Sequence, residues 1–183
     1  SSLGYTTSGT LADWQREIAQ NVRGNASMMI GVAVALAAPM LSLLGRESFG
    51  VHLFAESSKG KSTTLNIANS IYGNPEKIKL SWSSTDNALK TEAAARNDGF
   101  LTMDEIGEAK DGKMLESIAY ALFNGTDKNR NRKEGGNREI KRWKVTALST
   151  GEKDLETQLR LQDVKVHAGQ LVRLLNIPLE EAK

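Results

Sequence analysis

The sequence predicts an α/β fold with a mostly parallel central sheet flanked by helices and preceded by a helical segment. From Phe49 onward, short apolar runs typical of strands alternate with stretches of helical periodicity. Before that point, residues 9–45 show helical patterns alone. The 183 residues suffice for one domain with a sizeable core. We therefore expect a helical segment over 1–45 that packs on a core over 46–183, with the core ending before any helical lid.

The first helical segment divides into two expected helices, over residues 10–22 and 26–44. Pro39 should kink or stop the second helix, because proline lacks the backbone N–H that a helix interior needs. Gly45 is a suitable C-terminal cap. Residues 28–44 are apolar but fall short of the roughly 20 strongly apolar residues of a membrane span. We expect a buried helix there and no membrane partner.

The remaining elements follow from turn signals and apolar runs. Thr85 is a good N-cap for a helix that reaches Arg96. Gly125 ends another expected helix, over residues 113–124. We expect strands over 49–54, 78–82, 100–105, 143–148 and 171–177, and helices over 62–72, 85–96 and 113–124. His52 falls inside the first of these strands, which favours a buried histidine with satisfied hydrogen bonds over a metal ligand.

Residues 55–62 read Ala-Glu-Ser-Ser-Lys-Gly-Lys-Ser, between an expected strand and an expected helix. This context is typical of a phosphate-binding loop, and it predicts a P-loop NTPase core that binds ATP and Mg²⁺. Backbone N–H groups would face a β-phosphate, Lys61 would bridge the β- and γ-phosphates, and Ser62 would ligate Mg²⁺. The nucleotide-binding set is Ser57, Ser58, Lys59, Gly60, Lys61, Ser62 and Thr63. Ala55 replaces the usual first glycine, and a chance Gly-Lys-Ser turn is the alternative.

A second motif follows an apolar strand at Asp104 and Glu105. The carboxyl ends of parallel strands share one edge of the sheet, so Asp104 should face the phosphate loop and hold Mg²⁺ through water. Glu105 would polarise the water that attacks the γ-phosphate, an acid that a hydrolase needs and a nucleotide kinase does not. The alternative is a helix N-terminus that carries acids because they complement the helix dipole.

Two further residues are candidates for catalysis. Thr150, preferred over Ser149, ends a strand where a polar side chain can contact the γ-phosphate or the lytic water. Arg173 opens the last strand and would be an arginine finger that completes a neighbouring subunit's site. The alternatives are a simple polar turn for Thr150 and a solvated edge residue for Arg173.

The charge is unevenly distributed along the chain. The net charge is +2, yet residues 128–144 hold eight basic and two acidic residues, a net +6. This predicts a polyanionic partner, single- or double-stranded DNA, bound by Lys128, Arg130, Arg132, Lys133 and Arg138 around a turn at 135–136. A solvated loop is the alternative. The chain has no cysteine, which fits a reducing cytoplasm.

Several ordered blocks of the sequence resemble domain-of-unknown-function family 927, over a stretch from Trp14 to the C-terminus. These blocks are the phosphate loop, 82–89, 97–98, 101–106, 124–125, 128–130, 148–152 and 169–173. The family occurs in bacteria, phages and mobile elements, often with primase modules, and is described as helicases and inactivated derivatives. The resemblance implies an AAA+ ATPase, similar to minichromosome-maintenance helicases, that forms a ring, as a hexamer. It would place residues 128–142 in the central pore.

The function we expect is the ATP-binding and hydrolysing motor core of a ring-forming nucleic-acid helicase or translocase in phage or mobile-element DNA replication. Two alternatives remain open at this point. One is a nucleic-acid-binding scaffold that binds ATP without hydrolysing it. The other is a small-molecule kinase whose arginine-rich segment covers the phosphates.

Overall fold

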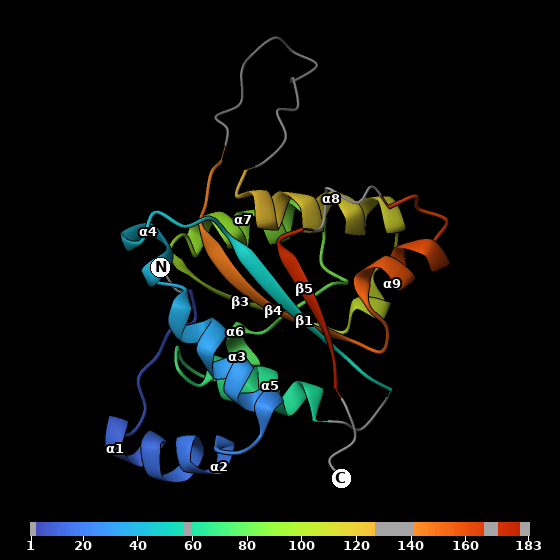
Figure 1. Cartoon of the computed structure of the whole chain (residues 1–183). Helices are drawn as coiled ribbons and strands as arrows, with labels where there is room; N and C mark the ends of the chain where they lie inside the picture. The colour runs from blue at the N-terminus through green and yellow to red at the C-terminus, as the bar shows by residue number, and fades with distance from the viewer. Residues whose placement is uncertain (1–2, 57–59, 127–140, 167–171, 180–183) are drawn as a thin grey trace.

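A single parallel sheet organises the part of the chain that the computed structural model describes, residues 3–56, 60–126, 141–166 and 172–179. Its strand order is β2-β3-β4-β1-β5, and all four strand pairings are parallel (Figure 1). The strands are β1 (Phe49–Phe54), β2 (Leu80–Ser81), β3 (Gly99–Asp104), β4 (Val145–Gly151) and β5 (Leu174–Pro178). The predicted α/β fold with a parallel sheet is therefore confirmed.

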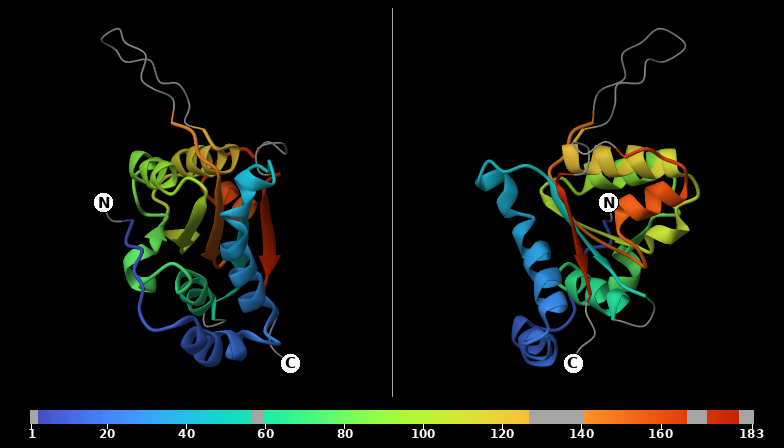
Figure 2. Two further views of the ribbon diagram at one scale, coloured as in Figure 1. Left: turned by 90° about the vertical axis from the view of Figure 1, so that its left-hand side faces the viewer. Right: turned by 45° about the vertical axis from the view of Figure 1, so that its right-hand side comes forward.

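Helices cover both faces of the sheet (Figures 1 and 2). One face carries α7 (Asp86–Ala95), α8 (Gly112–Asn124) and α9 (Leu155–Leu161). The other face carries α3 (Ala26–Ala37), α5 (Lys61–Asn69) and α6 (Pro75–Ile78). A short 3₁₀ helix, η2 (Ile106–Glu108), follows β3. The layers agree with a sheet whose strands are joined by helical crossovers.

Side chains alternate between two apolar cores along each central strand. In β4, Val145 and Ala147 pack with α7, α8 and α9, whereas Leu148 packs with α3 and α5. In β3, Leu101 and Met103 join the first core, and Phe100 joins the second. Because a strand repeats every two residues, this alternation also fixes the face that each polar residue at a strand end occupies.

The N-terminal helices lie on the α5 side of the sheet. They comprise α1 (Leu11–Trp14), a π-helical turn η1 (Gln15–Ala19), α2 (Gln20–Val22), α3 and α4 (Met40–Leu43). Thr10 and Asp13 form a capping box at the first helix start. The helix of 26–44 breaks at Pro39 and ends at Gly45, whose φ is +61°, as predicted. In the described part of the chain, no helix has the length and apolarity to cross a bilayer.

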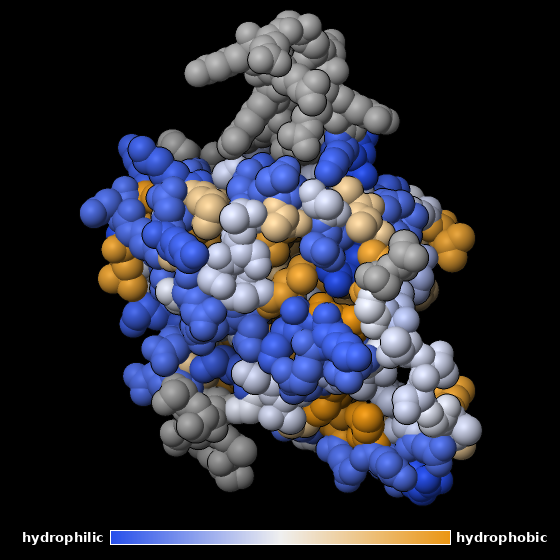
Figure 3. All heavy atoms as spheres, turned by 180° about the vertical axis from the view of Figure 1, so that it is seen from behind, coloured by the Kyte–Doolittle hydropathy of each residue, from blue (hydrophilic) through white to orange (hydrophobic). Residues whose placement is uncertain are grey.

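Contacts to the core fix this helical segment at several points. Trp14 Nε1 donates to Ser70 Oγ at 2.8 Å, and Tyr72 Oη donates to the Ala35 carbonyl at 2.7 Å. Thr146 Oγ1 of β4 donates to the Val34 carbonyl at 2.8 Å. The face opposite to the view of Figure 1 is mainly hydrophilic, with separate small apolar patches (Figure 3).

Two strand predictions were wrong in part, and two short helices, α6 and α9, were not predicted. The expected strand over 78–82 is only two residues long, because Asn74 caps α6 with Pro75 in its first turn. Helix α9 was not expected; Asp154 caps it by accepting from the Thr157 N–H, and its leucines are buried. The last strand begins at Leu174, so Arg173 precedes it rather than lying within it.

Candidate functional site

The carboxyl ends of β1, β4 and β3 meet at one edge of the sheet. Leu53 pairs with Thr150, and Met103 pairs with Ser149, so Asp104 lies level with Thr150. With neighbouring strands about 4.8 Å apart, Asp104 lies two strands, or about 10 Å, from the end of β1. The chain leaves β1 into the predicted phosphate loop, so the two predicted motifs lie at the same edge.

The loop reaches α5 through Gly60, which has a φ of +76° and forms the N-cap. Lys61 is 9% exposed, and its Nζ donates to the carbonyls of Ala55 at 2.5 Å and Glu56 at 3.2 Å. Ser62 and Thr63 are exposed on the first helical turn, whose N–H groups have no helical acceptor. Ser57, Ser58 and Lys59 lie outside the described residues.

Ala55 stands where the usual motif has its first glycine, and its φ is not positive. Its N–H donates to the Gly151 carbonyl at 3.2 Å, which continues the β1–β4 ladder by one residue. Alanine therefore adopts the local backbone without the strain that a positive φ would impose on a Cβ.

Thr150 contacts the Asp104 carboxylate, which ends β3, and the backbone of Glu105, the next residue. Its Oγ1 donates to Asp104 Oδ1 at 2.7 Å and accepts from the Glu105 N–H at 3.2 Å. Strand alternation places Asp104 and Thr150 on the α5 face, with Thr102, which bonds Asn69 of α5 at 2.8 Å. Thr150 thus faces the phosphate-loop helix and orients Asp104.

Glu105 has an unusual backbone. Its φ of +49° is in the left-handed region, which costs a non-glycine residue about 1 kcal/mol or more. Its Oε1 accepts from the Gly107 N–H at 3.2 Å, so Glu105 also caps η2. The helix-cap alternative is therefore observed in this structure, and a role for Glu105 in water activation stays a prediction.

Ser149 faces the opposite side from Thr150 and belongs to a buried hydrogen-bond chain. Trp82 Nε1 donates to Ser149 Oγ at 2.9 Å, and Ser149 Oγ is 2.8 Å from His52 Nδ1. His52 Nε2 is 2.9 Å from the Lys153 carbonyl, which only accepts, so Nε2 carries the proton and Ser149 donates to Nδ1. Burial lowers the pKa of His52 to about 4. The prediction of a satisfied core histidine is confirmed.

Lys79 also lies at the carboxyl edge of the sheet, and the sequence analysis did not predict it as a site residue. Its Nζ lies 3.6 Å from Asp104 Oδ2 and 3.4 Å from Glu76 Oε2. The lysine precedes β2, whose pairing with β3 brings it beside Asp104. No local motif surrounds Lys79 in the sequence, so only the strand pairing identifies it.

Arg173 lies at the other edge of the sheet, immediately before β5. It pairs with Glu47 and donates from Nη1 to the Phe123 carbonyl at 3.0 Å. The residues Lys128, Arg130, Arg132, Lys133 and Arg138 lie outside the described part of the chain. Thr126 and Arg142, which lie on either side of the undescribed residues 127–140, form an antiparallel bridge with each other.

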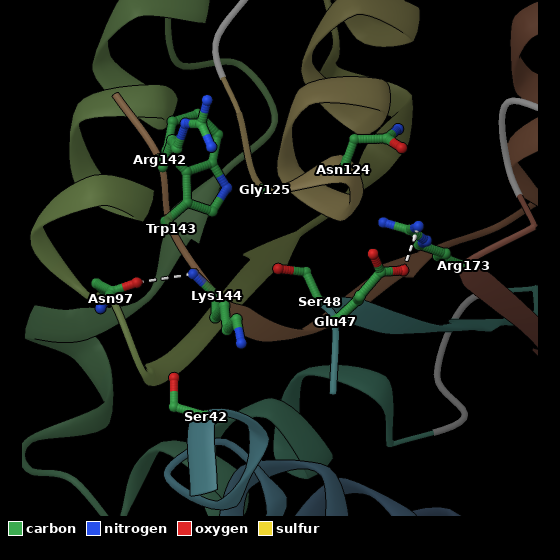
Figure 4. A pocket seen from close by; sticks show the side chains of 10 residues that line it. All are labelled: Ser42, Glu47, Ser48, Asn97, Asn124, Gly125, Arg142, Trp143, Lys144 and Arg173. Carbon is green, nitrogen blue, oxygen red and sulfur yellow. Dashed lines mark hydrogen bonds and ion pairs between the residues drawn. The ribbon is translucent and has the colours of Figure 1, made fainter. Parts of the chain in front are cut away.

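A cavity of about 430 Å³ lies at this second edge, away from the phosphate loop (Figure 4). Asn97 accepts from the Lys144 N–H at 2.8 Å on one side, and the Glu47–Arg173 pair closes the other. Its lining residues are Ser42, Glu47, Ser48, Asn97, Asn124, Gly125, Arg142, Trp143, Lys144 and Arg173. Three of these are cations, which suits an anionic ligand better than a neutral one.

The carboxyl edge fits a magnesium–nucleotide group chemically. The N-terminus of the nine-residue α5 supplies N–H groups and the positive end of a helix dipole. Lys61 now donates to loop carbonyls, which a phosphate oxygen would replace. Asp104 and Ser62 offer the hard oxygen ligands that Mg²⁺ prefers, and Mg²⁺ takes its other ligands from water and phosphates.

The strand order, together with the phosphate loop and Asp104 at the carboxyl edge of the sheet, defines a domain of the P-loop NTPase fold class. Residues 2–142 match the family described as "Domain of unknown function (DUF927)", and the chain belongs to that family. A search of curated proteins found no match.

The fold is similar to that of a solved structure described as "SCCmec type IV Cch - active helicase". The TM-score is 0.72 with 25% sequence identity, over 96% of this chain and 33% of the helicase. This chain therefore spans about a third of that helicase's length. NtrX from Brucella abortus in complex with ATP matches at a TM-score of 0.48 and 13% identity, over 92% of this chain and 39% of NtrX. Its similarity is too low to bear on function.

Proposed function

We propose that this chain is the ATP-binding and hydrolysing motor core of a ring-forming nucleic-acid helicase. One observation carries the proposal: Lys61 at the start of α5 and the Asp104–Thr150 pair occupy the same sheet edge and the same face of the sheet. Similarity to an active helicase over 96% of the chain supports the choice among nucleotide-using proteins. A nucleoside triphosphate bound there would reach both motifs at once.

Each residue at this edge then has a distinct role. Lys61 would leave the loop carbonyls and pair with the β- and γ-phosphates, while Ser62 and, through water, Asp104 would hold Mg²⁺. Thr150 keeps Asp104 in one orientation through its 2.7 Å hydrogen bond. The metal, when bound, neutralises charge that develops on the transferred phosphoryl group. Ser57, Ser58, Lys59, Gly60 and Thr63 complete the phosphate-binding loop in this proposal.

Glu105 would act on the attacking water after its carboxylate turns away from the Gly107 N–H. Its left-handed backbone is the kind of strain that functional sites keep. The same bond to Gly107 favours a second candidate function, a scaffold that binds ATP without hydrolysing it. The two functions differ in turnover and share nucleotide binding.

The proposed nucleic-acid contact uses the basic segment between Thr126 and Arg142. Arg142 and Lys144 both line the cavity at the amino edge of the sheet and place two positive charges there. Such cations are available to a phosphate backbone. Contacts of this kind track the backbone and carry little sequence information.

Assembly into a ring is the remaining part of the proposal. The outer surface of α3 and α4 exposes Met29, Leu36, Met40 and Leu43, and large exposed apolar residues of this kind often mark interfaces. Arg173 would serve a neighbouring subunit in the ring. The AAA+ type of ring, its hexameric state, a primase module as neighbour and a place in phage or mobile-element replication rest on the resemblance described above.

The test is ATP hydrolysis by the purified chain with and without single-stranded DNA, in the presence of Mg²⁺. We expect turnover that needs no second acceptor and that rises with DNA, and we expect Lys61→Ala to abolish it. Lys77→Ala, which changes an exposed lysine of α6, is the matched control and should keep wild-type turnover. Nucleotide binding without turnover would favour the scaffold, and turnover unaffected by Lys61→Ala would refute the site.

A further inference from the structure

The segment that enters β2 places a second lysine at the proposed nucleotide site. Helix α6 ends at Ile78, and Lys79 takes an extended backbone with φ −66° and ψ 133°. Strand β2 then pairs Leu80 with Met103 and Ser81 with Asp104. The Trp82 N–H donates to the Asp104 carbonyl at 3.3 Å, which holds this segment against the end of β3.

The contacts of Lys79 are electrostatic and loose. Its Nζ lies 3.6 Å from Asp104 Oδ2 and 3.4 Å from Glu76 Oε2, longer than the hydrogen bonds that charged groups form. The side chains of Lys79 and Asp104 are 22% and 23% exposed, so water reaches both. The lysine stem is flexible, and nothing in these contacts fixes the ammonium in one place.

Asp104 is therefore held asymmetrically. One carboxylate oxygen accepts a 2.7 Å hydrogen bond from Thr150, and the other faces the Lys79 ammonium. A Mg²⁺ ion near Asp104 would repel this ammonium, whereas the phosphate oxygens that accompany the metal would attract it. The positions of Lys61 and Lys79 place cations on two sides of the space between the loop and β3.

We propose that Lys79 is a second phosphate-binding lysine of the nucleotide site, which pairs with Asp104 in this structure and would pair with the terminal phosphate of a bound nucleoside triphosphate. This inference rests on the proposed function of the same edge. It assigns a residue that would distinguish triphosphate from diphosphate, because the terminal phosphate is the group that the diphosphate lacks. The competing role for Lys79 is structural: an i,i+3 ion pair with Glu76 that supports α6.

Calorimetric titrations with ATP and ADP, each in EDTA and in Mg²⁺, separate the two roles without a turnover assay. In EDTA, Lys79→Gln should weaken ATP binding about tenfold, the scale of a partly exposed charge contact, and ADP binding by less than about twofold. Lys79→Arg should keep most of the ATP affinity because it retains the charge. Lys77→Gln, a neighbouring exposed lysine of α6, should bind both nucleotides like the wild type.

Glu76→Gln distinguishes the structural role directly. If Lys79 only supports α6, Glu76→Gln and Lys79→Gln should have the same effect as each other, and each should change the affinities for ATP and ADP by the same factor. That result overturns the proposal. Unchanged ATP affinity in Lys79→Gln, beside lost affinity in Lys61→Ala, overturns it while the proposed function stands. A wild-type chain that binds neither nucleotide overturns both.

Discussion

The buried His52 predicts a specific loss of stability at acidic pH. His52 is fully buried on β1 and accepts from Ser149 at Nδ1, so protonation at Nδ1 would break that hydrogen bond and bury a charge. Burial holds the pKa of His52 at about 4, against about 6.5 in the unfolded chain. Below pH 6.5 the unfolded chain binds a proton that the folded chain does not. The stabilising contribution is therefore complete above pH 6.5 and disappears as the pH falls towards 4.

The magnitude follows from linkage. A difference of about 2.5 pKa units at 1.36 kcal/mol each gives about 3 kcal/mol, a large share of the 5–15 kcal/mol that typically stabilises a domain. Urea unfolding between pH 7.5 and 4 measures it. Carboxylates titrate in the same range, so the informative quantity is the difference between the wild type and His52→Gln at each pH.

We expect the wild type to lose about 3 kcal/mol more than His52→Gln across this range. His167→Gln, which removes the only other histidine of the sequence, is the matched comparison, because it shows how much of the pH dependence comes from a histidine other than His52. Parallel pH profiles for the wild type and His52→Gln would refute the reasoning. If His52→Gln does not fold, an NMR titration of the wild-type imidazole decides instead: a His52 midpoint near 6.5 contradicts the argument.

Three further predictions test the site and the sheet. Glu105→Gln should retain ATP binding and lower turnover by orders of magnitude, and a collapse of ATP affinity would instead show a structural role. Arg173→Ala should lower turnover only in the assembled oligomer. Mixing Arg173→Ala subunits with Lys61→Ala subunits should restore part of the activity, because each variant lacks a different half of the shared site. No recovery despite co-assembly would favour an arginine without a catalytic role. Gly50→Ala should destabilise the fold by about 1–3 kcal/mol in urea unfolding, because its Cβ would lie 2.2 Å from Phe123 Cε1; wild-type stability would exclude this contact.

Local patterns in the sequence were sufficient to predict the motif positions. The run before Ala55 and the run before Asp104 both read as strands, and parallel strands end at a shared edge, so the two motifs could be placed together before the structure was known. The choice between Thr150 and Ser149 could not be made in this way. Both faces of β4 pack against helices, so the alternation of residues alone does not show which face meets α5.

Features that depend on the pairing of strands distant in sequence were not predicted. Lys79 is near Asp104 because β2 pairs with β3, a contact between segments about 25 residues apart in sequence. Helix α6 did have a local signal, Asn74 followed by Pro75, which is typical of a helix start. The alternating run that follows was predicted as a strand from residue 78 to 82, and α6 was missed because so short a helix leaves little room for a periodic pattern.

The two edges of the sheet constrain how Arg173 can take part in catalysis. Arg173 precedes β5, whereas the phosphate loop follows β1, a parallel neighbour of β5. Six residues of strand separate these edges by about 20 Å, and an arginine side chain spans far less than that. A nucleotide bound at the phosphate loop could therefore reach Arg173 only from another copy of the chain. The amino edge of one subunit would face the carboxyl edge of the next, a head-to-tail contact that generates a closed ring or a helical filament rather than a twofold dimer. The Glu47–Arg173 pair would have to open in that contact, so assembly and completion of the site would be one event.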